Sequence, residues 1–189
     1  MLRKAYVGLG SNVGNRLGNI VAALLELARG ARPVGVSSIY ETAPVGFEDQ
    51  GPFLNAACAL ATAMSPRELL EWLKRLEVEL GRTASPRWGP RKIDLDVLAI
   101  GEVVVSEADL KIPHERLGER LFACEPLAEI APDFEPPGLG ATVRELRDRL
   151  RGVQEARLWM KSDDLLERLG GWPGRVERNH CPVKGEGRP

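Results

Sequence analysis

The hydrophobic pattern of the first thirty residues changes from that of a strand to that of a helix. Residues 4–10 are mostly apolar, and polar, turn-forming residues follow at 11–15. This combination predicts a buried strand and a turn. Apolar residues then recur at helical spacing, at Leu17, Ile20, Val21, Leu24, Leu25 and Ala28. They predict an amphipathic helix, with Gly30 placed where a left-handed residue would end it.

Two more strands and a second helix are predicted next. Residues 34–42 and 53–62 are rich in β-forming or small apolar residues, and a segment rich in Gly and Pro separates them. Residues 65–68, Ser-Pro-Arg-Glu, form a capping box with proline at the first helical position. An apolar stripe follows as far as Gly81, at Leu69, Leu70, Leu73, Leu76 and Leu80.

The pattern of residues 93–100 is that of another strand, which completes the order β-α-β-β-α-β. That order predicts an α+β fold, a ferredoxin-like sandwich with an antiparallel sheet. Helical patterns near 121–130 and 142–150 predict extra C-terminal helices. We therefore expect one folded domain over residues 1–158. Residues 159–189 are polar and contain Gly and Pro, so we expect a poorly ordered tail there.

Composition narrows the class of protein. The 189 residues are 43% hydrophobic and 28% charged, which fits a single globular domain. The net charge of −1 gives no overall field that would attract nucleic acid or an anionic membrane. The three cysteines are odd in number and far apart, which indicates reduced thiols. With no long apolar stretch at the start, we expect a cytoplasmic protein, and we predict a monomer without nucleic-acid or membrane partners.

A basic loop precedes the last predicted strand. Residues 81–92 contain four cations, two prolines and no acidic residue. Directly after the loop, Asp94 and Asp96 alternate with apolar residues, so both carboxylates lie on one face of the strand. Two carboxylates at this spacing suit a pair of Mg²⁺ ions bound together with phosphate oxygens. The alternative is that the two carboxylates only pair with Arg87 and Arg91 on a hydrated sheet face.

Two other segments have less specific patterns. Trp88 lies in the basic loop, where it is suited to stack on a planar ring, although packing back on the body of the protein explains it equally well. Residues 8–12, Gly-Leu-Gly-Ser-Asn, superficially suggest a phosphate-binding loop. They lack the Lys-Ser/Thr of a P-loop and the third glycine of a dinucleotide fingerprint. We interpret them as a tight structural turn.

Together these residues resemble the 6-hydroxymethyl-7,8-dihydropterin pyrophosphokinase family over residues 3–150. The most specific stretch is residues 87–98, Arg-Trp-Gly-Pro-Arg-Lys-Ile-Asp-Leu-Asp-Val-Leu. The other matching motifs are residues 8–12, 40–46, 53–57 and 112–114. The order and spacing of several motifs make a chance resemblance improbable.

The resemblance implies an enzyme that transfers pyrophosphate from ATP, its co-substrate, to 6-hydroxymethyl-7,8-dihydropterin in folate biosynthesis, releasing AMP. Asp94 and Asp96 are implied to hold two Mg²⁺ ions, and Arg82 and Arg91 to contact the phosphates, so these four are the predicted catalytic residues. The predicted ATP-binding residues are Arg82, Arg87, Trp88, Arg91, Ile112, His114 and Arg120. The predicted pterin-binding residues are Thr42, Pro44, Val45, Phe53, Asn55, Trp88, Asp94 and Phe122.

The chain departs from the pattern of the best-known family members at several places. A second arginine is missing soon after Arg82, Phe53 stands where tyrosine is usual, and Glu115 follows the histidine where an aromatic residue is common. Two other functions fit parts of the sequence. One is a metal-dependent nucleotidyltransferase that releases pyrophosphate. The other is a non-catalytic ferredoxin-like ligand-binding module, against which stand the near-neutral charge and the 5% of aromatic residues.

Overall fold

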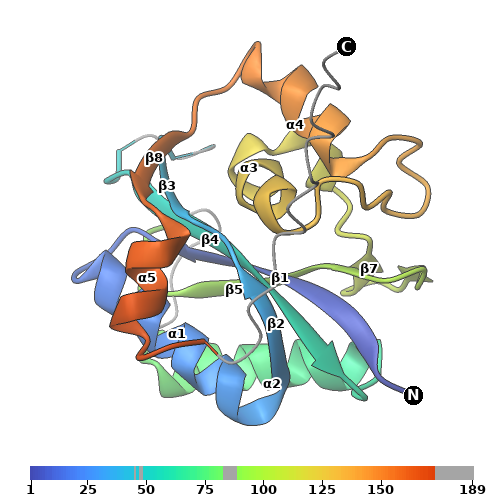
Figure 1. Ribbon diagram of the computed structural model, residues 1–189, viewed down its shortest axis with the longest axis horizontal. Coiled ribbons are helices and arrows are strands. Elements are labelled where there is room, and N and C mark those ends of the chain that lie inside the picture. The colour runs from blue at the N-terminus through green and yellow to red at the C-terminus, as the bar shows by residue number, and fades with distance from the viewer. Residues whose placement is uncertain (45, 47–48, 83–88, 173–189) are drawn as a thin grey trace, which may run out of the picture.

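Figure 1 shows the computed structural model of the protein, which describes residues 1–44, 46, 49–82 and 89–172. Within these residues the main sheet has six strands, in the order β5-β1-β4-β3-β8, with β2 also paired to β4. Every pairing in this sheet is antiparallel. The strands are β1 (Arg3–Ser11), β2 (Arg32–Val36), β3 (Ile39–Thr42), β4 (Phe53–Thr62), β5 (Asp94–Ile100) and β8 (Arg157–Met160).

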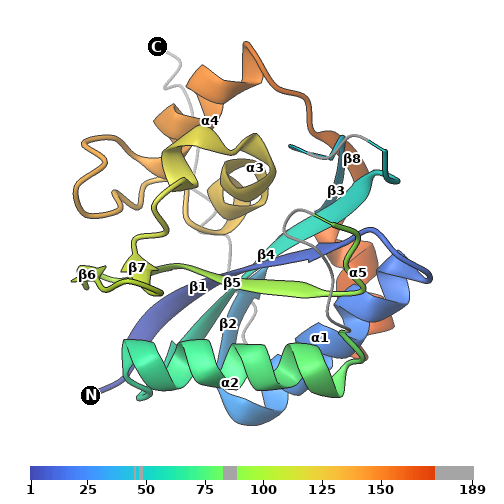
Figure 2. The same cartoon turned by 180° about the vertical axis from the view of Figure 1, so that it is seen from behind.

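Helices cover both faces of the sheet, as the two opposite views show (Figures 1 and 2). The α-helices of the described residues are α1 (Arg16–Gly30), α2 (Pro66–Glu79), α3 (Leu121–Ile130), α4 (Val143–Arg151) and α5 (Ser162–Arg168). Between β5 and α3 lie the hairpin of β6 (Val105–Ser106) and β7 (Lys111–Ile112) and the short 3-10 helix η1 (Leu117–Glu119). The mixed α and β composition, the antiparallel sheet and the extra C-terminal helices are as predicted.

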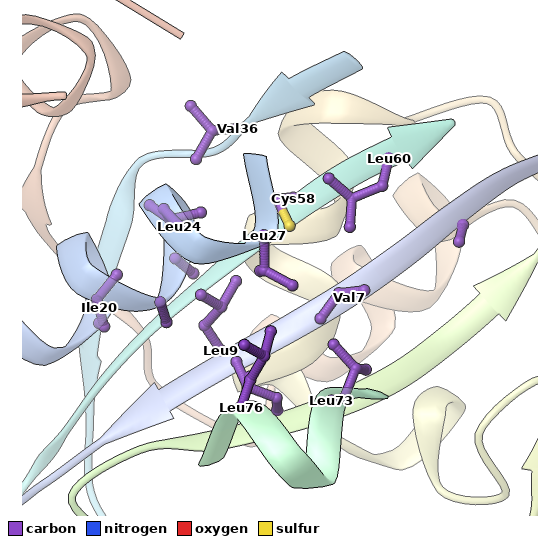
Figure 3. Packing of buried hydrophobic residues seen from close by; sticks show 14 of the residues in the cluster. Val7, Leu9, Ile20, Leu24, Leu27, Val36, Cys58, Leu60, Leu73 and Leu76 are labelled. Atoms are coloured by element: carbon purple, nitrogen blue, oxygen red, sulfur yellow. The ribbon is translucent and has the colours of Figure 1, made fainter. Parts of the chain in front are cut away.

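Side-chain alternation along β1 divides the core into two clusters. Val7 and Leu9 point to the face that α1 and α2 cover, and Figure 3 shows them among the leucines of those helices. Tyr6 points the other way and packs with residues of α3 and α4. Because side chains alternate across a strand, Gly8 and Gly10 also belong to the α3 face. There they leave space above the sheet.

Two local predictions differ from the structure. The strand predicted over 34–42 is divided into β2 and β3, because the Ser37 hydroxyl accepts a hydrogen bond from Ala57 N at 2.9 Å and donates one to Ser38 O at 2.7 Å. Gly30 does not adopt a left-handed conformation, and the extended residue Ala31 caps α1 instead. A Cβ at Gly30 would lie 2.2 Å from Trp72, so glycine is needed there for the close approach of α2.

The prediction of a poorly ordered tail is wrong for residues 159–172. β8 extends the sheet beside β3, and Ser162 N donates a hydrogen bond to Ser38 Oγ at 3.0 Å. After it, Leu165 of α5 enters the α1–α2 core cluster, as do Leu169 and Trp172, which follow the helix. So short a helix buries too few residues to produce a clear hydrophobic period. Residues 173–189 lie outside the described part of the chain.

The described segments 1–44, 46, 49–82 and 89–172 contain no helix with the length and apolar character that crossing a bilayer requires.

Candidate active site

A pocket of about 280 Å³ opens on the α3 face of the sheet. Its floor is made by β1, β4 and β5, and one wall is the first turn of α3. The residues that line it are Gly8, Leu9, Gly10, Thr42, Ala43, Gln50, Phe53, Asn55, Ala56, Gly89, Arg91, Asp94, Asp96, Leu98, His114, Arg120, Phe122 and Ala123. Segments far apart in the sequence therefore meet here, including nine of the residues that the sequence predicted for the site.

Two glycines of β1 allow the pocket to exist. Gly8 and Gly10 lie within β1, so the interpretation of residues 8–12 as a tight turn is wrong for these two residues. A Cβ at Gly10 would lie 3.3 Å from Asn55 Oδ1, and one at Gly8 would lie 3.2 Å from Leu98 Cδ2. Both distances are tighter than ordinary van der Waals contact. Glycine therefore lets side chains of β4 and β5 lie across β1.

The charged half of the pocket is built around the two aspartates of β5. Asp94 and Asp96 are two residues apart on this strand, so both face the pocket. Asp94 Oδ1 accepts from Arg82 Nη1 at 2.8 Å, and its Oδ2 accepts from Arg91 Nη1 at 2.6 Å. The Asp96 side chain is 38% exposed and its Oδ1 lies 3.6 Å from Lys74 Nζ. The predicted catalytic residues Arg82, Arg91, Asp94 and Asp96 are thus brought together.

Helix α2 supports the outer edge of β5 with two side chains that the sequence did not suggest. Glu77 is 2% exposed, and its Oε1 accepts from Leu95 N at 2.7 Å. Lys74 Nζ donates to Leu95 O at 2.9 Å and to Glu77 Oε1 at 2.8 Å. Glu77 Oε2 also accepts a hydrogen bond from Arg82. Glu77 and Lys74 thus form hydrogen bonds with the backbone N–H and C=O groups of Leu95, which lies between the two aspartates.

Burial and neighbouring charges shift two pKa values of this cluster in opposite directions. Burial opposes ionisation of Asp94, but the neighbouring cations, above all Arg91, outweigh it and hold the pKa of that carboxyl group below its usual range. Burial dominates at Glu77 and raises its pKa despite the charge of Lys74. Asp94 is therefore an ionised acceptor at neutral pH, with two guanidinium groups against it.

The donor set fits Mg²⁺ shared with a phosphate ligand. Among residues 1–44, 46, 49–82 and 89–172, no group of three or more His, Cys, Asp or Glu side chains could hold a metal. Asp94 and Asp96 offer two carboxylates on one face, and Mg²⁺ commonly binds through one or two carboxylates with the remaining ligands from phosphates and water. The two carboxylates therefore suit an ion whose other ligands come from phosphate oxygens and water.

His114 and Arg120 form the side of the charged half that lies near α3. His114 Nε2 and Arg120 Nη1 are 3.5 Å apart, and His114 Nδ1 accepts from Arg116 N at 3.1 Å. Burial lowers the pKa of His114, and burial followed by the charge of Arg116 lowers the pKa of Arg120. Arg120 Nε is buried and has no hydrogen-bond partner in the part of the chain that the structure describes.

The neutral half of the pocket lies at the β3–β4 end of the sheet. Asn55 Nδ2 donates to Thr42 Oγ1 at 2.9 Å, and both side chains are buried. Phe53 is on the same strand face as Asn55, and Phe122 reaches the pocket from α3. Arg120 Cζ lies 5.5 Å from the centre of the Phe122 ring. This half combines aromatic surface with one fixed amide, as a flat heterocycle requires.

Not every predicted site residue lines the pocket. Arg82 and Pro44 are not among the lining residues, although Arg82 contacts Asp94. Ile112 is buried in the α1–α2 core cluster. Val45, Arg87 and Trp88 lie outside the described residues. Four features of the site were not predicted from the sequence: the two floor glycines, Gln50 and the Lys74–Glu77 pair. An acidic residue at a core-facing helical position of α2 was the available signal for Glu77.

The comparisons with known proteins point to one family. The family described as 7,8-dihydro-6-hydroxymethylpterin-pyrophosphokinase (HPPK) matches residues 6–132. A 2-amino-4-hydroxy-6-hydroxymethyldihydropteridine pyrophosphokinase of Bacillus subtilis (strain 168) is 46% identical over 139 residues, which cover 72% of this chain and 83% of that protein. A mitochondrial "Folate synthesis bifunctional protein" of Arabidopsis thaliana is 47% identical over 128 residues, 67% of this chain and 23% of that protein.

A solved structure supports the fold independently. The crystal structure of wild-type Plasmodium falciparum HPPK-DHPS superposes with a TM-score of 0.63 at 15% sequence identity. The match covers 79% of this chain and 45% of that one, so this chain spans less than half of its length. At this identity the likeness concerns the fold alone.

Proposed function

The chain belongs to the 7,8-dihydro-6-hydroxymethylpterin-pyrophosphokinase family, and we propose that the pocket on the α3 face of its sheet is the active site. The protein is an ATP-dependent pyrophosphokinase of folate synthesis. It transfers pyrophosphate from ATP to the hydroxymethyl group of 6-hydroxymethyl-7,8-dihydropterin and releases AMP. The alternatives of a nucleotidyltransferase and a non-catalytic binding module are not favoured by the comparisons.

In this reaction the main task of the protein is to align the two substrates and to stabilise the negative charge of the phosphates. The hydroxymethyl oxygen forms a bond to the β-phosphorus of ATP, while the bond from that phosphorus to the oxygen bridging to the α-phosphate breaks. AMP keeps the bridging oxygen, and the hydroxyl proton passes to solvent. Phosphoryl transfer of this kind depends on alignment and electrostatic stabilisation. The pocket supplies both, with cations at one end and a fixed amide at the other.

In the charged half, we assign Asp94 and Asp96 to two Mg²⁺ ions. The bound ions would neutralise negative charge on the phosphates. Arg91 lines the pocket and Arg82 contacts Asp94, so both guanidinium groups are within reach of a polyphosphate at this wall. Guanidinium groups suit phosphate because they donate paired hydrogen bonds. We therefore assign both arginines to the transferred phosphates.

We assign the nucleotide to the part of the charged half that contains His114 and Arg120. The unpartnered buried Nε of Arg120 supports this, because such a donor is costly unless a ligand accepts from it. Arg87, Trp88 and Ile112 remain proposed ATP-binding residues on the resemblance, although Ile112 would act from the core behind the pocket wall.

In the neutral half, we assign the pterin ring to the space bounded by Phe53 and Phe122, with its polar edge on Asn55 and Thr42. The Thr42–Asn55 hydrogen bond supports this because it fixes the amide that would face the ring. Pro44, Val45, Trp88 and Asp94 remain proposed pterin contacts on the resemblance.

The wider predictions on fold and assembly also remain proposals. The antiparallel order β5-β1-β4-β3, with α1 and α2 packed on one face, supports a ferredoxin-like arrangement for the first hundred residues. We propose that the protein acts in the cytoplasm as a monomer, on small molecules and without nucleic-acid partners. Residues 1–158 remain the proposed catalytic domain, to which the structure adds β8 and α5 as packed elements.

The observation that carries the site assignment is the meeting of the β5 carboxylates with the Thr42–Asn55 pair in one pocket. The test is to mix the protein with ATP, Mg²⁺ and 6-hydroxymethyl-7,8-dihydropterin and to separate the nucleotide products by chromatography. We expect AMP that depends on the pterin, without free pyrophosphate. Free pyrophosphate together with an adenylated pterin, in place of free AMP, would indicate nucleotidyl transfer. Full activity after Asp96→Ala would move the active site elsewhere.

A further inference from the structure

Asn12 connects two segments that line opposite halves of the pocket. It stands directly after β1, and it belongs to the Gly-Leu-Gly-Ser-Asn motif, whose last residue the site assignment leaves without a role. Its side chain is partly buried between the segment that precedes β4 and the end of the basic loop. These segments are separated from Asn12 by 38–39 and by 79 positions in the sequence.

Every polar atom of the Asn12 amide has a partner in one of the two segments. Oδ1 accepts from Arg91 N at 2.7 Å. Nδ2 donates to Gln50 Oε1 at 2.9 Å and to Gly51 O at 3.3 Å. The backbone adds a further bond, because Asn12 N donates to Arg91 O at 3.1 Å. One side chain thus fixes the backbone of Arg91 relative to Gln50 and Gly51.

Each of the two segments that Asn12 connects contributes a residue to the pocket lining. Arg91 and Gln50 line the pocket, and the Arg91 guanidinium contacts Asp94 Oδ2 at 2.6 Å. Gln50 and Gly51 lie just before Phe53, which begins the strand of the neutral half. A small displacement of either segment therefore changes the bonds that Asn12 makes to the other.

The base of this connection is buried and hydrogen-bonded. Ser11 is fully buried, and its Oγ donates to Lys92 O at 2.5 Å while accepting from Asn19 Nδ2 at 3.1 Å. The end of β1 and the end of the basic loop are therefore joined at two successive residues. Asn12 lies between these hydrogen-bonded chain ends and the Gln50–Gly51 segment.

We propose that Asn12 is a positioning residue that couples nucleotide binding in the charged half to pterin binding in the neutral half. A ligand that orders Arg91 also orders Gln50 and Gly51 through Asn12, and the reverse holds equally because coupling between two sites is reciprocal. The proposal rests on the assignment of the two ligands to the two halves. Asn12 itself contacts neither ligand in this account.

The test measures the affinity for 6-hydroxymethyl-7,8-dihydropterin by calorimetry, with and without saturating Mg²⁺ and a non-hydrolysable ATP analogue. The ratio of the two dissociation constants is the coupling factor, which we expect to be about tenfold or more in the natural chain. In Asn12→Ala we expect this factor to fall to within about twofold of one, with smaller changes in the affinity for each ligand alone. Titrating the analogue with and without pterin should give the same factor.

Two further variants separate coupling from folding. Asn12→Asp keeps an acceptor for Arg91 N but places a carboxylate oxygen against Gly51 O, so it should also lose coupling while remaining folded. Asn15→Ala, three residues away, removes the cap of α1 and should lower the melting temperature with no change in the coupling factor.

The outcomes distinguish this proposal from the proposed function. A coupling factor near one in the natural chain, or an unchanged factor in both Asn12 variants, would overturn the role of Asn12. Failure of the natural chain to bind either ligand would instead overturn the site assignment. Equal loss of affinity for each ligand with coupling retained would reduce Asn12 to a structural residue.

Discussion

The charged half and the neutral half of the pocket are organised by different interactions. Around Asp94 and Asp96, partly exposed side chains from α2, β5 and the basic loop are held by opposite charges. Around Thr42 and Asn55, two buried side chains of adjacent strands share one neutral hydrogen bond. Charge interactions act at a distance and tolerate movement, whereas a buried neutral bond requires fixed geometry. Under the proposed assignment, the polyphosphate would meet an adaptable surface and the pterin ring a fixed one.

The largest effect is expected when charge is removed from the half of the pocket where the phosphates would bind. Asp96→Ala should lower turnover by about three orders of magnitude or more, because losing a metal ligand removes several kcal/mol of transition-state stabilisation. The fold should survive, since the Asp96 side chain is 38% exposed. The checks are AMP formation and thermal unfolding followed by circular dichroism.

Asp109→Ala is the matched control for this substitution. Asp109 is exposed, lies outside the pocket and pairs with Arg67, so its loss should leave turnover unchanged. If Asp96→Ala kept more than about a tenth of the natural activity, the assignment of metal ligation to this carboxylate would be wrong.

The neutral half should respond more selectively. Asn55→Ala should weaken pterin binding by about tenfold to a hundredfold, because one fixed partner of the ring edge is lost. Binding of an ATP analogue should change by less than about twofold, because the side-chain hydrogen bond of Asn55 within the described residues goes to Thr42 and not to the charged half. Calorimetric titration with each ligand checks both. A comparable loss of affinity for both ligands would show that the two halves are not separable.

A third test measures how the free energy of unfolding depends on pH through His114 in the charged half. Burial lowers the pKa of His114 in the folded protein below its ordinary value of 6.5. As pH falls through 6.5, the unfolded chain binds the proton first, so the folded state loses stability, by at most about 1.4 kcal/mol per pH unit. Chemical unfolding at pH 7.5 and 5.5 should therefore show a smaller loss for His114→Gln than for the natural chain. An equal loss in both proteins would contradict the assigned burial effect.

The smallest expected effect is that of salt on ligand binding, which compares the two halves without any mutation. Raising ionic strength from 0.05 to 0.5 M should weaken binding of the ATP analogue by about several fold, because salt screens the partly exposed cations. Pterin binding in the neutral half should be nearly unchanged under the same conditions. If salt weakened the binding of both ligands equally, charge would not be the basis of the difference between the halves.

The sequence predicted the fold well where a local signal was strong. The capping box at residues 65–68 placed the start of α2, and the alternation of Asp94 and Asp96 placed both carboxylates on one face of β5. Strand alternation is a local property, so it can be recognised from neighbouring residues alone. The proposed roles of the two aspartates came from the resemblance to the family.

Features that depend on distant neighbours could not be predicted in this way. The need for Gly10 appears only when Asn55 lies across β1, and the role of Glu77 only when α2 lies beside Leu95. The docking of α5 depends on Leu165, whose burial is set by the α1–α2 cluster. In each case the contact joins elements whose relative position the local pattern does not determine.

The pairing of β8 with β3 has a consequence for the order of events during synthesis. Ser162 N bonds to Ser38 Oγ across 124 positions, so β3 gains its second neighbour long after it leaves the ribosome. At about 5–20 residues per second, this interval lasts on the order of 6–25 s. Until then the strand that ends at Thr42 has an open edge, and nascent chains are exposed there to pairing with other strands. Ribosome profiling of pauses between residues 42 and 162, combined with chaperone capture, would locate this period of vulnerability.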